Sequence, residues 1–354
     1  MRALVLSEYR RLELLEMPAP EPGPGDVLVR VAACGICGSD VHGWDGSTGR
    51  RIPPIVMGHE AAGVVAAVGS GVKAFAPGDR VTMDSTVSCG ECAFCRRGEI
   101  NLCDHRQVLG VSCAEFRRAG AFAEYVVAPE RIVYRLPDQL SFPEAAMLEA
   151  VAVALHAVRV SQHRAGEAGR ARNAAETALV IGAGMIGLLT IQAARAAGFS
   201  RVLIADIDPS RLKLAESVGA EETLLASGDD LGAEIMRRTD GLGVDLALEA
   251  VGLNTTVAVA IDSIRKGGRV TLVGNVSPEV TLPLQKVVSR QLLLQGSCAS
   301  SGEYPDAIEM MANGSIRVAP LISAVAPLRE GPEWFARLRG REPNLMKVVL
   351  NPEI

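Results

Sequence analysis

The sequence predicts an α/β protein with two domains, one built mostly from β-strands and one around a doubly wound parallel sheet. Its 354 residues suit two domains, since about 150 residues make one. Short alternating runs broken by Gly and Pro fill the first part of the chain. Strand and helix patterns alternate regularly through the later part. The composition, 48% hydrophobic and 22% charged, is typical of a folded chain.

The first part of the chain, from residue 1 to about residue 143, predicts strands joined by long loops. Its apolar runs are VLVRVAACG, AAGVVAAVGSGV, GDRVTM and GAFAEYVVA. The Pro-rich residues 18–26 predict a surface connection, and residues 26–33 the strand that follows it.

The later part of the chain predicts a helix at 144–158, an exposed connection at 161–176, and then alternating strands and helices. The expected strands are residues 177–182, 201–206, 222–226, 244–250, 268–274 and 291–296. The expected helices between them are residues 185–198, 209–219, 231–239 and 255–268. Such alternation indicates a parallel sheet covered on both faces. Residues 297–354 end in a strand-like MKVVL and are too few for a third domain.

Charge and hydrophobicity exclude several classes of protein. With 36 basic and 41 acidic residues the net charge is −5, and without a basic stripe we expect neither a nucleic-acid partner nor a membrane partner. Only four consecutive apolar residues occur near the N-terminus, at residues 3–6, too few for a signal peptide. The longest uncharged stretch, residues 178–194, is slightly too short to span a bilayer. These features predict a cytoplasmic protein.

A glycine-rich turn predicts a dinucleotide site. Gly182, Gly184 and Gly187 form G-x-G-x-x-G directly after an expected strand and at the start of an expected helix. The first glycine makes the tight turn, the second admits a pyrophosphate, and the third allows close helix packing.

An acidic residue indicates which dinucleotide binds. Asp206 ends the next strand, nineteen residues after Gly187, where a carboxylate accepts from the adenosine ribose. This favours NAD over NADP, although Arg211 leaves room for both. The alternative is that Asp206 or Asp208 caps the helix that begins near Pro209.

Four of the eight cysteines form a second motif. Cys89, Cys92, Cys95 and Cys103 lie within fifteen residues, and four thiolates suit a closed tetrahedral zinc site. An iron–sulfur cluster or redox thiols remain the alternative. We expect Cys34, Cys113 and Cys298 to be packing residues.

A further group of residues predicts a catalytic metal. Catalytic zinc needs three protein ligands and one open position. Cys37 and His59 are suitable first ligands, with Glu60 or Glu149 as the third. A single cysteine or histidine of this kind more often has a structural role than a catalytic one. Their combination with a dinucleotide-binding fold favours the catalytic interpretation.

Five motifs of this chain resemble, in the same order, motifs of the zinc-dependent medium-chain dehydrogenase/reductase superfamily. They are CGICGSDVH, GHEAAGVV, CGECAFCRRGEINLC, GAFAEYV and GAGMIG. The sorbitol dehydrogenase-like polyol branch of that superfamily is the most similar. The resemblance covers the whole chain. It implies a GroES-like catalytic domain at 1–148 and 297–354, with a structural zinc lobe at 89–103. It also implies a Rossmann NAD-binding domain at 149–296.

The resemblance also implies an activity. A zinc- and NAD-dependent enzyme of this kind moves hydride from a secondary alcohol of a polyol or sugar-like substrate to NAD, while zinc lowers the pKa of the substrate hydroxyl. Glu149 stands where polyol dehydrogenases carry a glutamate and simple alcohol dehydrogenases a cysteine. It is implied to bind zinc directly or through a water molecule. Ser39 and His42 are implied to relay the proton, and Asp40 to orient His59.

Further implied features concern the cofactor site and the substrate pocket. Met185, Ile186, Val251 and Val273 are implied to contact NAD, and each subunit to hold two zinc ions. Gly43 replaces a pocket tyrosine, Ala299 and Ser300 replace an Arg–Tyr pair, and Ala150 replaces a usual proline. These departures predict a roomier pocket, for another polyol, a cyclitol, an aldose or a phosphorylated sugar alcohol, and Trp44 is a candidate for its lining.

Other expectations concern assembly and rival functions. The resemblance implies a homo-oligomer, a tetramer before a dimer, with sheet edges near residues 270–274 in the subunit contact. A rival enzyme is an L-threonine-type or other alcohol or aldose dehydrogenase. A rival from another class is a regulatory protein that binds zinc and NAD(H) without catalysis, which the joint presence of ligands and relay residues argues against.

Overall fold

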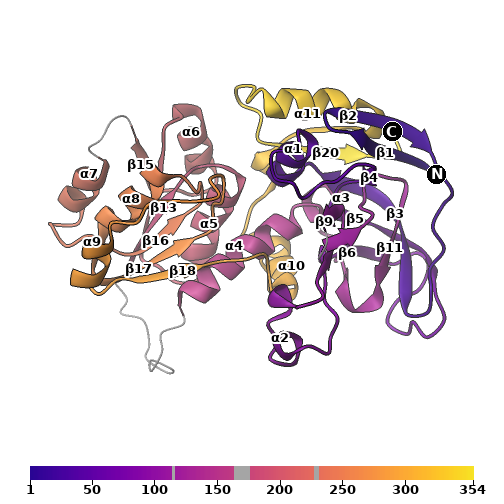
Figure 1. The fold of residues 1–354 in the computed structure, drawn as a ribbon, viewed down its shortest axis with the longest axis horizontal. Coiled ribbons are helices and arrows are strands. Elements are labelled where there is room, and N and C mark those ends of the chain that lie inside the picture. Colours follow the sequence, from indigo (N-terminus) through magenta and orange to yellow (C-terminus); the bar gives the residue numbers. More distant parts are fainter. Residues whose placement is uncertain (114–115, 163–175, 227–230) are drawn as a thin grey trace. The chain divides into compact units, whose positions relative to one another are not determined.

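The computed structural model describes residues 1–113, 116–162, 176–226 and 231–354, and divides into two compact units (Figure 1). The first comprises Met1–Glu149, Ser301–Gly314 and Leu321–Ile354, and the second Ala150–Ser300 and Ser315–Pro320. These bounds differ from the expected domains, because Glu149 groups with the first unit and residues 297–300 and 315–320 with the second. The expected connection at 161–176 lies mostly outside the described residues.

The first unit is built around a seven-stranded sheet whose central strand is β3 (Asp26–Gly35). Alternate residues of this strand, Val27, Val29 and Val31, are buried, as its apolar pattern predicts. Along the sheet the order is β12 (Val133–Arg135), β6 (Arg80–Met83), β5 (Glu60–Val68), β3, β20 (Lys347–Asn351) and β19 (Ile322–Pro327), with β11 (Tyr125–Pro129) also paired to β3.

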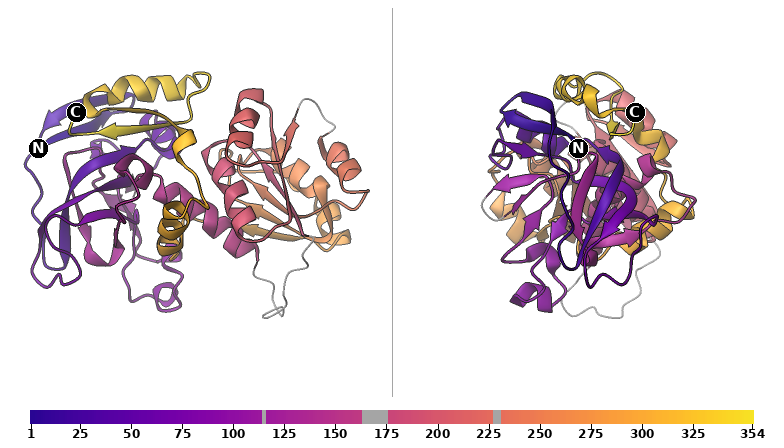
Figure 2. Two further views of the ribbon diagram at one scale, coloured as in Figure 1. Left: turned by 180° about the vertical axis from the view of Figure 1, so that it is seen from behind. Right: turned by 90° about the vertical axis from the view of Figure 1, so that its right-hand side faces the viewer.

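The C-terminal strand completes this sheet. Strand β20 pairs antiparallel with β3, Leu350 opposite Cys34, and parallel with β19. Figure 2 shows the yellow C-terminal segment among the indigo and violet strands of the N-terminal part. The predicted strand at MKVVL is confirmed, and it brings Lys347 into the interior of the first unit.

Smaller elements surround the main sheet. The short strands are β1 (Arg2–Glu8), β2 (Arg11–Glu16), β4 (Ile55–Val56), β7 (Thr86–Val87), β8 (Gln107–Val108), β9 (Val111–Cys113) and β10 (Phe116–Arg118). The helices are α1 (Gly38–Trp44), α2 (Ala93–Arg96), α3 (Phe142–Ala145), α4 (Leu148–Ser161), which continues into the second unit, α10 (Tyr304–Ala312) and α11 (Gly331–Arg339). Phe122 and Phe335 meet edge to face in the core, so α11 is anchored on the N-terminal strands.

The second unit is the predicted doubly wound domain. Its sheet has six parallel strands in the order β15 (Glu222–Leu225), β14 (Arg201–Asp206), β13 (Thr177–Ile181), β16 (Val244–Glu249), β17 (Ile264–Leu272) and β18 (Leu293–Gly296). Its helices are α5 (Met185–Ala196), α6 (Pro209–Ser217), α7 (Leu231–Arg238), α8 (Asn254–Ser263) and α9 (Leu284–Ser289). The strand order reverses between β13 and β16, and ligands of such sheets bind outside the carboxyl ends of strands at that point.

Two expectations about this sheet are wrong. The helix expected at 255–268 ends at Ser263, because Ile264 is extended, buried and paired with Val244, and Gly267 has a positive φ of 67°. Residues 270–272 do not lie at the sheet edge, because β17 pairs with β16 on one side and β18 on the other. The edge strand is β18.

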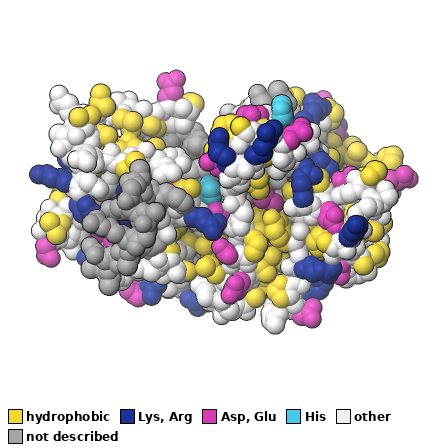
Figure 3. Space-filling view, turned by 90° about the horizontal axis from the view of Figure 1, so that it is seen from below, with side chains coloured by type: hydrophobic (Ala, Val, Ile, Leu, Met, Phe, Trp, Pro, Cys, Tyr) yellow, Lys and Arg dark blue, Asp and Glu magenta, His cyan; other side chains and the backbone are white. Residues whose placement is uncertain are grey.

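Figure 3 shows Lys and Arg side chains scattered among acidic and neutral ones on the face in view. Among the described residues, no helix is both long and apolar enough to cross a membrane.

Candidate active site and metal centres

Three of the expected ligands converge in the first unit. Cys37 immediately precedes α1. His59 immediately precedes β5 and Glu60 begins it, after a turn at Gly58 with φ of 92°. One donor atom from each of Cys37, His59 and Glu60 lies within 4.8 Å of the other two. A thiolate, an imidazole and a carboxylate at this spacing are a donor set that zinc accepts.

Asp40 holds two of these ligands in place. Its Oδ2 accepts the backbone N–H of Cys37 at 3.2 Å, and its Oδ1 lies 3.3 Å from Nδ1 of His59. Burial acts to raise the pKa of Asp40, but His59 and Arg51 outweigh it and hold that pKa well below its ordinary value. Burial likewise opposes the charge on His59, whereas Asp40 and Cys37 raise its pKa well above the usual value. Asp40 is thus a buried carboxylate that orients the imidazole.

Glu60 has a partner that the sequence did not reveal. Lys347 Nζ donates to both carboxylate oxygens of Glu60, at 2.6 and 2.8 Å, and also to the carbonyl of Ile36 at 3.1 Å. Both side chains are buried. A Cβ at Gly35 would overlap Glu60 Oε2, so the carboxylate can lie in this position only because residue 35 has no side chain. In the sequence, a lysine at the start of the otherwise apolar strand KVVL could have indicated a buried ion pair.

Glu149 stands apart from this group. It lies in the first turn of α4 and is partly buried, and it is not among the described residues whose donor atoms converge. Burial raises the pKa of its carboxyl, and the charges of Glu60 and Asp40 add to that effect against His59 and Lys347. Of the two glutamates left open by the sequence, Glu60 lies with Cys37 and His59, and Glu149 contributes charge nearby.

Arg51, which the sequence did not single out, lies in the segment between α1 and β4 and reaches Ser39 in α1. It is 4% exposed, and its Nη2 donates to Ser39 Oγ at 3.2 Å and to Asp40 Oδ1 at 3.0 Å. Ser39 is exposed and His42 is half-buried. No hydrogen bond within the described parts of the chain joins those two side chains.

The expected roomier pocket at Gly43 is wrong as a structural inference. A Cβ on Gly43 would lie 2.1 Å from Cγ of Arg51, so the arginine fills the space that a larger side chain would take. Trp44 packs edge to face on Phe335 in the core. Ser300 is 3% exposed and belongs to the second unit.

The glycine-rich turn has the geometry of a phosphate loop. Gly182 has φ of 98°, and a Cβ on Gly187 would collide with the carbonyl oxygen of Gly182. A Cβ on Gly184 would meet nothing within 4 Å, so this glycine leaves open space at the start of α5. Met185 and Ile186 begin that helix. Free N–H groups at this end favour an anion.

The structure separates the two aspartates near β14. Asp208 caps α6 by accepting the N–H of Ser210 at 2.8 Å, while Asp206 accepts the N–H of Ala183 in the glycine-rich turn at 2.6 Å. The capping role therefore belongs to Asp208, and Asp206 stands at the carboxyl edge of the sheet beside the turn. Arg211 lies 3.7 Å from Asp208 in an exposed ion pair.

Other residues line the same sheet edge. Val251 lies beside the turn, since its Cγ2 would be 2.6 Å from a Cβ on Gly182. Val273 donates its N–H to the carbonyl of Glu249 at 2.8 Å. The buried Glu249 carboxylate accepts the N–H groups of Val251 and Gly252 and thereby shapes this loop. Sequence reasoning missed Glu249, although a carboxylate ending a buried strand was a visible signal.

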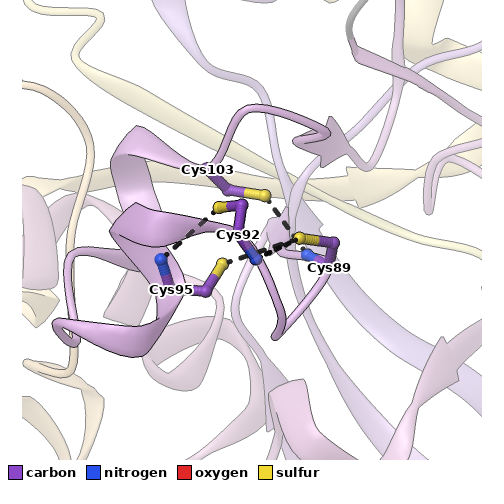
Figure 4. Close-up of side chains that lie close together, drawn as sticks. All are labelled: Cys89, Cys92, Cys95 and Cys103. Carbon is purple, nitrogen blue, oxygen red and sulfur yellow. Dashed lines mark hydrogen bonds between the residues drawn. The ribbon is translucent and has the colours of Figure 1, made fainter.

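The four clustered cysteines point their sulfurs toward one another (Figure 4). Their sulfurs lie within 4.8 Å of one another. Cys103 Sγ accepts the N–H of Cys89 at 3.2 Å and that of His105 at 3.3 Å. The N–H of Cys95, with that of Asp104, lowers the pKa of the Cys92 thiol to about 6. Four such sulfurs fit a closed tetrahedral metal site.

Cys34, Cys113 and Cys298 were expected to be packing residues. Cys34 is fully buried, whereas Cys298 is exposed, so the expectation is wrong for Cys298. The side chain of Cys113 lies outside the described residues.

Residues 23–138 match the model of the alcohol dehydrogenase GroES-like domain, and residues 186–313 match that of the zinc-binding dehydrogenase. The chain belongs to the zinc-dependent medium-chain dehydrogenase family. Its expected fold class, a GroES-like domain with a Rossmann domain, is confirmed. As a member of this family the protein is an oxidoreductase.

Individual members of the family show how much of the chain is shared. L-idonate 5-dehydrogenase of Vitis vinifera is 38% identical over 86% of this chain and 81% of its own length. Sorbitol dehydrogenase of Bacillus subtilis is 32% identical over 99% of this chain and 97% of its own. A zinc-binding dehydrogenase of Sinorhizobium meliloti 1021, solved bound to NADP, has 33% identity and a TM-score of 0.87 over 99% of both chains. The expected polyol dehydrogenase branch is confirmed.

Proposed function

We propose that the protein is a zinc- and NAD-dependent dehydrogenase that oxidises a secondary alcohol of a polyol or sugar-like substrate to the ketone. The observation that carries this proposal is the convergence of Cys37, His59 and Glu60, with the Asp40 carboxylate in contact with the first two. Two of its similar proteins are named for sorbitol and for L-idonate, both polyhydroxylated compounds.

Cys37 and His59 would hold the catalytic zinc, with Glu60 or Glu149 completing its ligands. The donor set fits zinc because a soft thiolate and an imidazole are its preferred ligands. Bound zinc supplies Lewis acidity, which lowers the pKa of the substrate hydroxyl. The second set, Cys89, Cys92, Cys95 and Cys103, would hold a structural zinc, giving two ions per subunit.

The chain's own residues supply the remaining chemistry. Asp40 holds the His59 ring through Nδ1, which leaves Nε2 to face a metal. Ser39 would take the proton from the substrate hydroxyl, and His42 would release it to solvent. Bound NAD would accept the hydride of the carbinol carbon at its nicotinamide.

The cofactor would bind the second unit at the carboxyl edge of its sheet. The pyrophosphate would lie at the turn of Gly182, Gly184 and Gly187, and the adenosine ribose at Asp206. A 2′-phosphate would meet the charge of Asp206, which supports NAD. Ile207, which is 79% exposed beside that carboxylate, offers an apolar surface for the adenine.

We assign the catalytic domain to the first unit and the NAD-binding domain to the second. Free thiolates need a reducing compartment, which supports a cytoplasmic location. A homo-oligomer, tetramer or dimer, is supported by the edge strand β18 and by exposed apolar side chains near it. Leu284, Val288 and Leu293 are 68%, 70% and 43% exposed.

The proposal is tested by measuring NADH formation from NAD with polyols, cyclitols, aldoses, sugar phosphates and L-threonine, with and without a zinc chelator. Chelator-sensitive oxidation of a polyol or sugar is the expected result. Oxidation of threonine alone would assign the rival amino-alcohol reaction. Binding of NAD without any turnover by the zinc-loaded protein would favour the non-catalytic alternative.

Cofactor choice has its own test. Replacing Asp206 by Ala should weaken NAD binding and raise the relative use of NADP, since the carboxylate would no longer repel a 2′-phosphate. The measurement is kcat/KM with each cofactor. Unchanged NAD kinetics would show that Asp206 serves only the backbone of the turn.

A further inference from the structure

We propose that Arg51 is a positioning residue that holds the Ser39 hydroxyl so that its hydrogen and one lone pair are both available to relay the substrate proton. This inference rests on the proposed function, because it concerns the proton that leaves the substrate hydroxyl. It starts from a buried guanidinium that neither the expected ligand set nor the expected relay includes.

One nitrogen of Arg51 makes two contacts. Nη2 carries two hydrogens, and it donates at 3.2 Å to Ser39 Oγ and at 3.0 Å to Asp40 Oδ1. Both hydrogens are therefore used, and the nitrogen links the exposed Ser39 to the fully buried Asp40. Nη1 is 3.4 Å from the carbonyl of Arg50.

The path of Arg51 to Ser39 depends on Gly43. A Cβ at that position would come within 2.1 Å of Arg51 Cγ and 3.0 Å of its Cβ. These atoms lie near the backbone of Arg51, so the side chain could not step aside cheaply. Gly43 has no positive φ, and its role here is to leave space.

The contact decides what Ser39 can do. A serine hydroxyl has one hydrogen to donate and two lone pairs to accept. Arg51 occupies one lone pair and cannot accept a hydrogen bond in return. One lone pair remains for the substrate proton, and the Ser39 hydrogen must point away from the guanidinium. As the substrate proton reaches Oγ, the hydrogen already on Oγ leaves toward the next acceptor, and the balance of the reaction is one hydride to NAD and one proton to solvent.

The competing explanation makes Arg51 only a counter-ion of Asp40. In that case, replacing Arg51 would lower kcat by disturbing Asp40 and the His59 ring that Asp40 orients. The size of that loss would be the same with and without the Ser39 hydroxyl. The two explanations therefore differ in whether Arg51 and Ser39 are energetically coupled.

A double-mutant cycle measures this coupling in the zinc-loaded protein. Arg51→Met should lower kcat about tenfold, a part of what positioned proton transfer contributes, with KM within about threefold. In a Ser39→Ala background the same change should lower kcat less than about twofold. Lysine still donates hydrogen bonds and cannot accept them, so the kcat of Arg51→Lys should stay within about threefold of the wild-type value. The exposed neighbour Arg50→Met is the matched control. Turnover is followed with whichever of xylitol, D-sorbitol and myo-inositol the wild type oxidises fastest.

A second readout does not depend on turnover. The tertiary alcohol 2-methyl-2-propanol has a hydroxyl proton but no carbinol hydrogen to lose as hydride. Proton release on its addition to the protein with NAD, followed with a pH indicator, should be slower in Arg51→Met than in Arg50→Met at equal zinc content. Gly43→Ala displaces the guanidinium without removing its charge, and it should slow proton release as Arg51→Met does. This variant replaces Arg51→Met in the experiment if Arg51→Met does not fold.

Equal effects of Arg51→Met with and without Ser39, together with unchanged proton release, would overturn the proposal and leave Arg51 as a counter-ion. A wild type that oxidises no polyol would instead count against the proposed function. Proton release would still report on Arg51 in that case.

Discussion

The two candidate metal centres of the first unit are assembled in opposite ways. The four-cysteine centre takes all its ligands from residues 89–103, with backbone N–H groups of the same loop donating to its sulfurs. The other centre joins α1, β5 and β20, and it is surrounded by buried charges on Asp40, Arg51 and Lys347. A local ligand set needs only its own loop, whereas a dispersed set needs the whole sheet and a network of compensating charges.

We expect the largest loss of turnover from a change at the centre formed by Cys37, His59 and Glu60. His59→Ala should lower turnover by more than about a hundredfold, beyond the usual cost of losing an outer partner of a metal ligand. Folding and NAD binding should be retained, because the second unit has its own core. Steady-state kinetics and NAD titration check this, and normal turnover would refute the catalytic assignment of His59.

The matched change at the local centre is Cys92→Ser. It should remove one zinc ion per subunit and lower the thermal midpoint, because metal binding supplies folding free energy to such a loop. Turnover per correctly folded molecule should fall far less than in His59→Ala. Metal analysis and thermal unfolding measure both effects. A Cys92 variant as inactive as His59→Ala, yet fully stable, would break the distinction between the two centres.

The charge network predicts a large loss of stability when one partner is removed. Lys347→Met leaves the Glu60 carboxylate buried and unpaired, which should cost about 3–5 kcal/mol of unfolding free energy. In the double variant Lys347→Met with Glu60→Gln, much of that loss should be recovered. Urea unfolding of the wild type, the two single variants and the double variant checks the cycle, and additive losses would show that the ion pair is not the cause.

Asp84 is the opposite case, a buried carboxyl that faces acidic neighbours. Burial, with the charges of Glu149 and Glu303, raises its pKa to about 7. A carboxyl whose folded pKa is raised costs nothing below its unfolded pKa near 4 and destabilises the fold increasingly as pH rises to 7. Asp84→Asn should therefore stabilise the protein at pH 8 by about 2 kcal/mol, after allowance for a buried amide, and much less at pH 5. Unfolding at the two pH values decides this. A gain that is the same at both would contradict the raised pKa.

Local features were predictable where the chemistry is local in the chain. The strand at 201–206 was predicted to the residue, and the four cysteines and the three glycines of the turn lie as their spacing indicates. The helix expected at 255–268 was too long, because pairing of Ile264 with Val244 overrode its helical pattern. The roomier pocket expected at Gly43 was wrong, because the side chain of Arg51 fills the space that a larger residue at position 43 would occupy.

The sequence by itself determined the two-domain α/β class, the family and the residue types of both candidate metal centres, since periodicity and motif spacing are properties of short segments. Only the tertiary structure showed that Glu60 lies within 4.8 Å of Cys37 and His59, that Lys347 forms an ion pair with it, and that Asp208 rather than Asp206 caps α6. Those outcomes depend on contacts between residues far apart in the chain, and β20 reaches Glu60 from 287 positions away. Which buried charge finds a partner is settled by packing, because the cost of an unpaired charge depends on its surroundings.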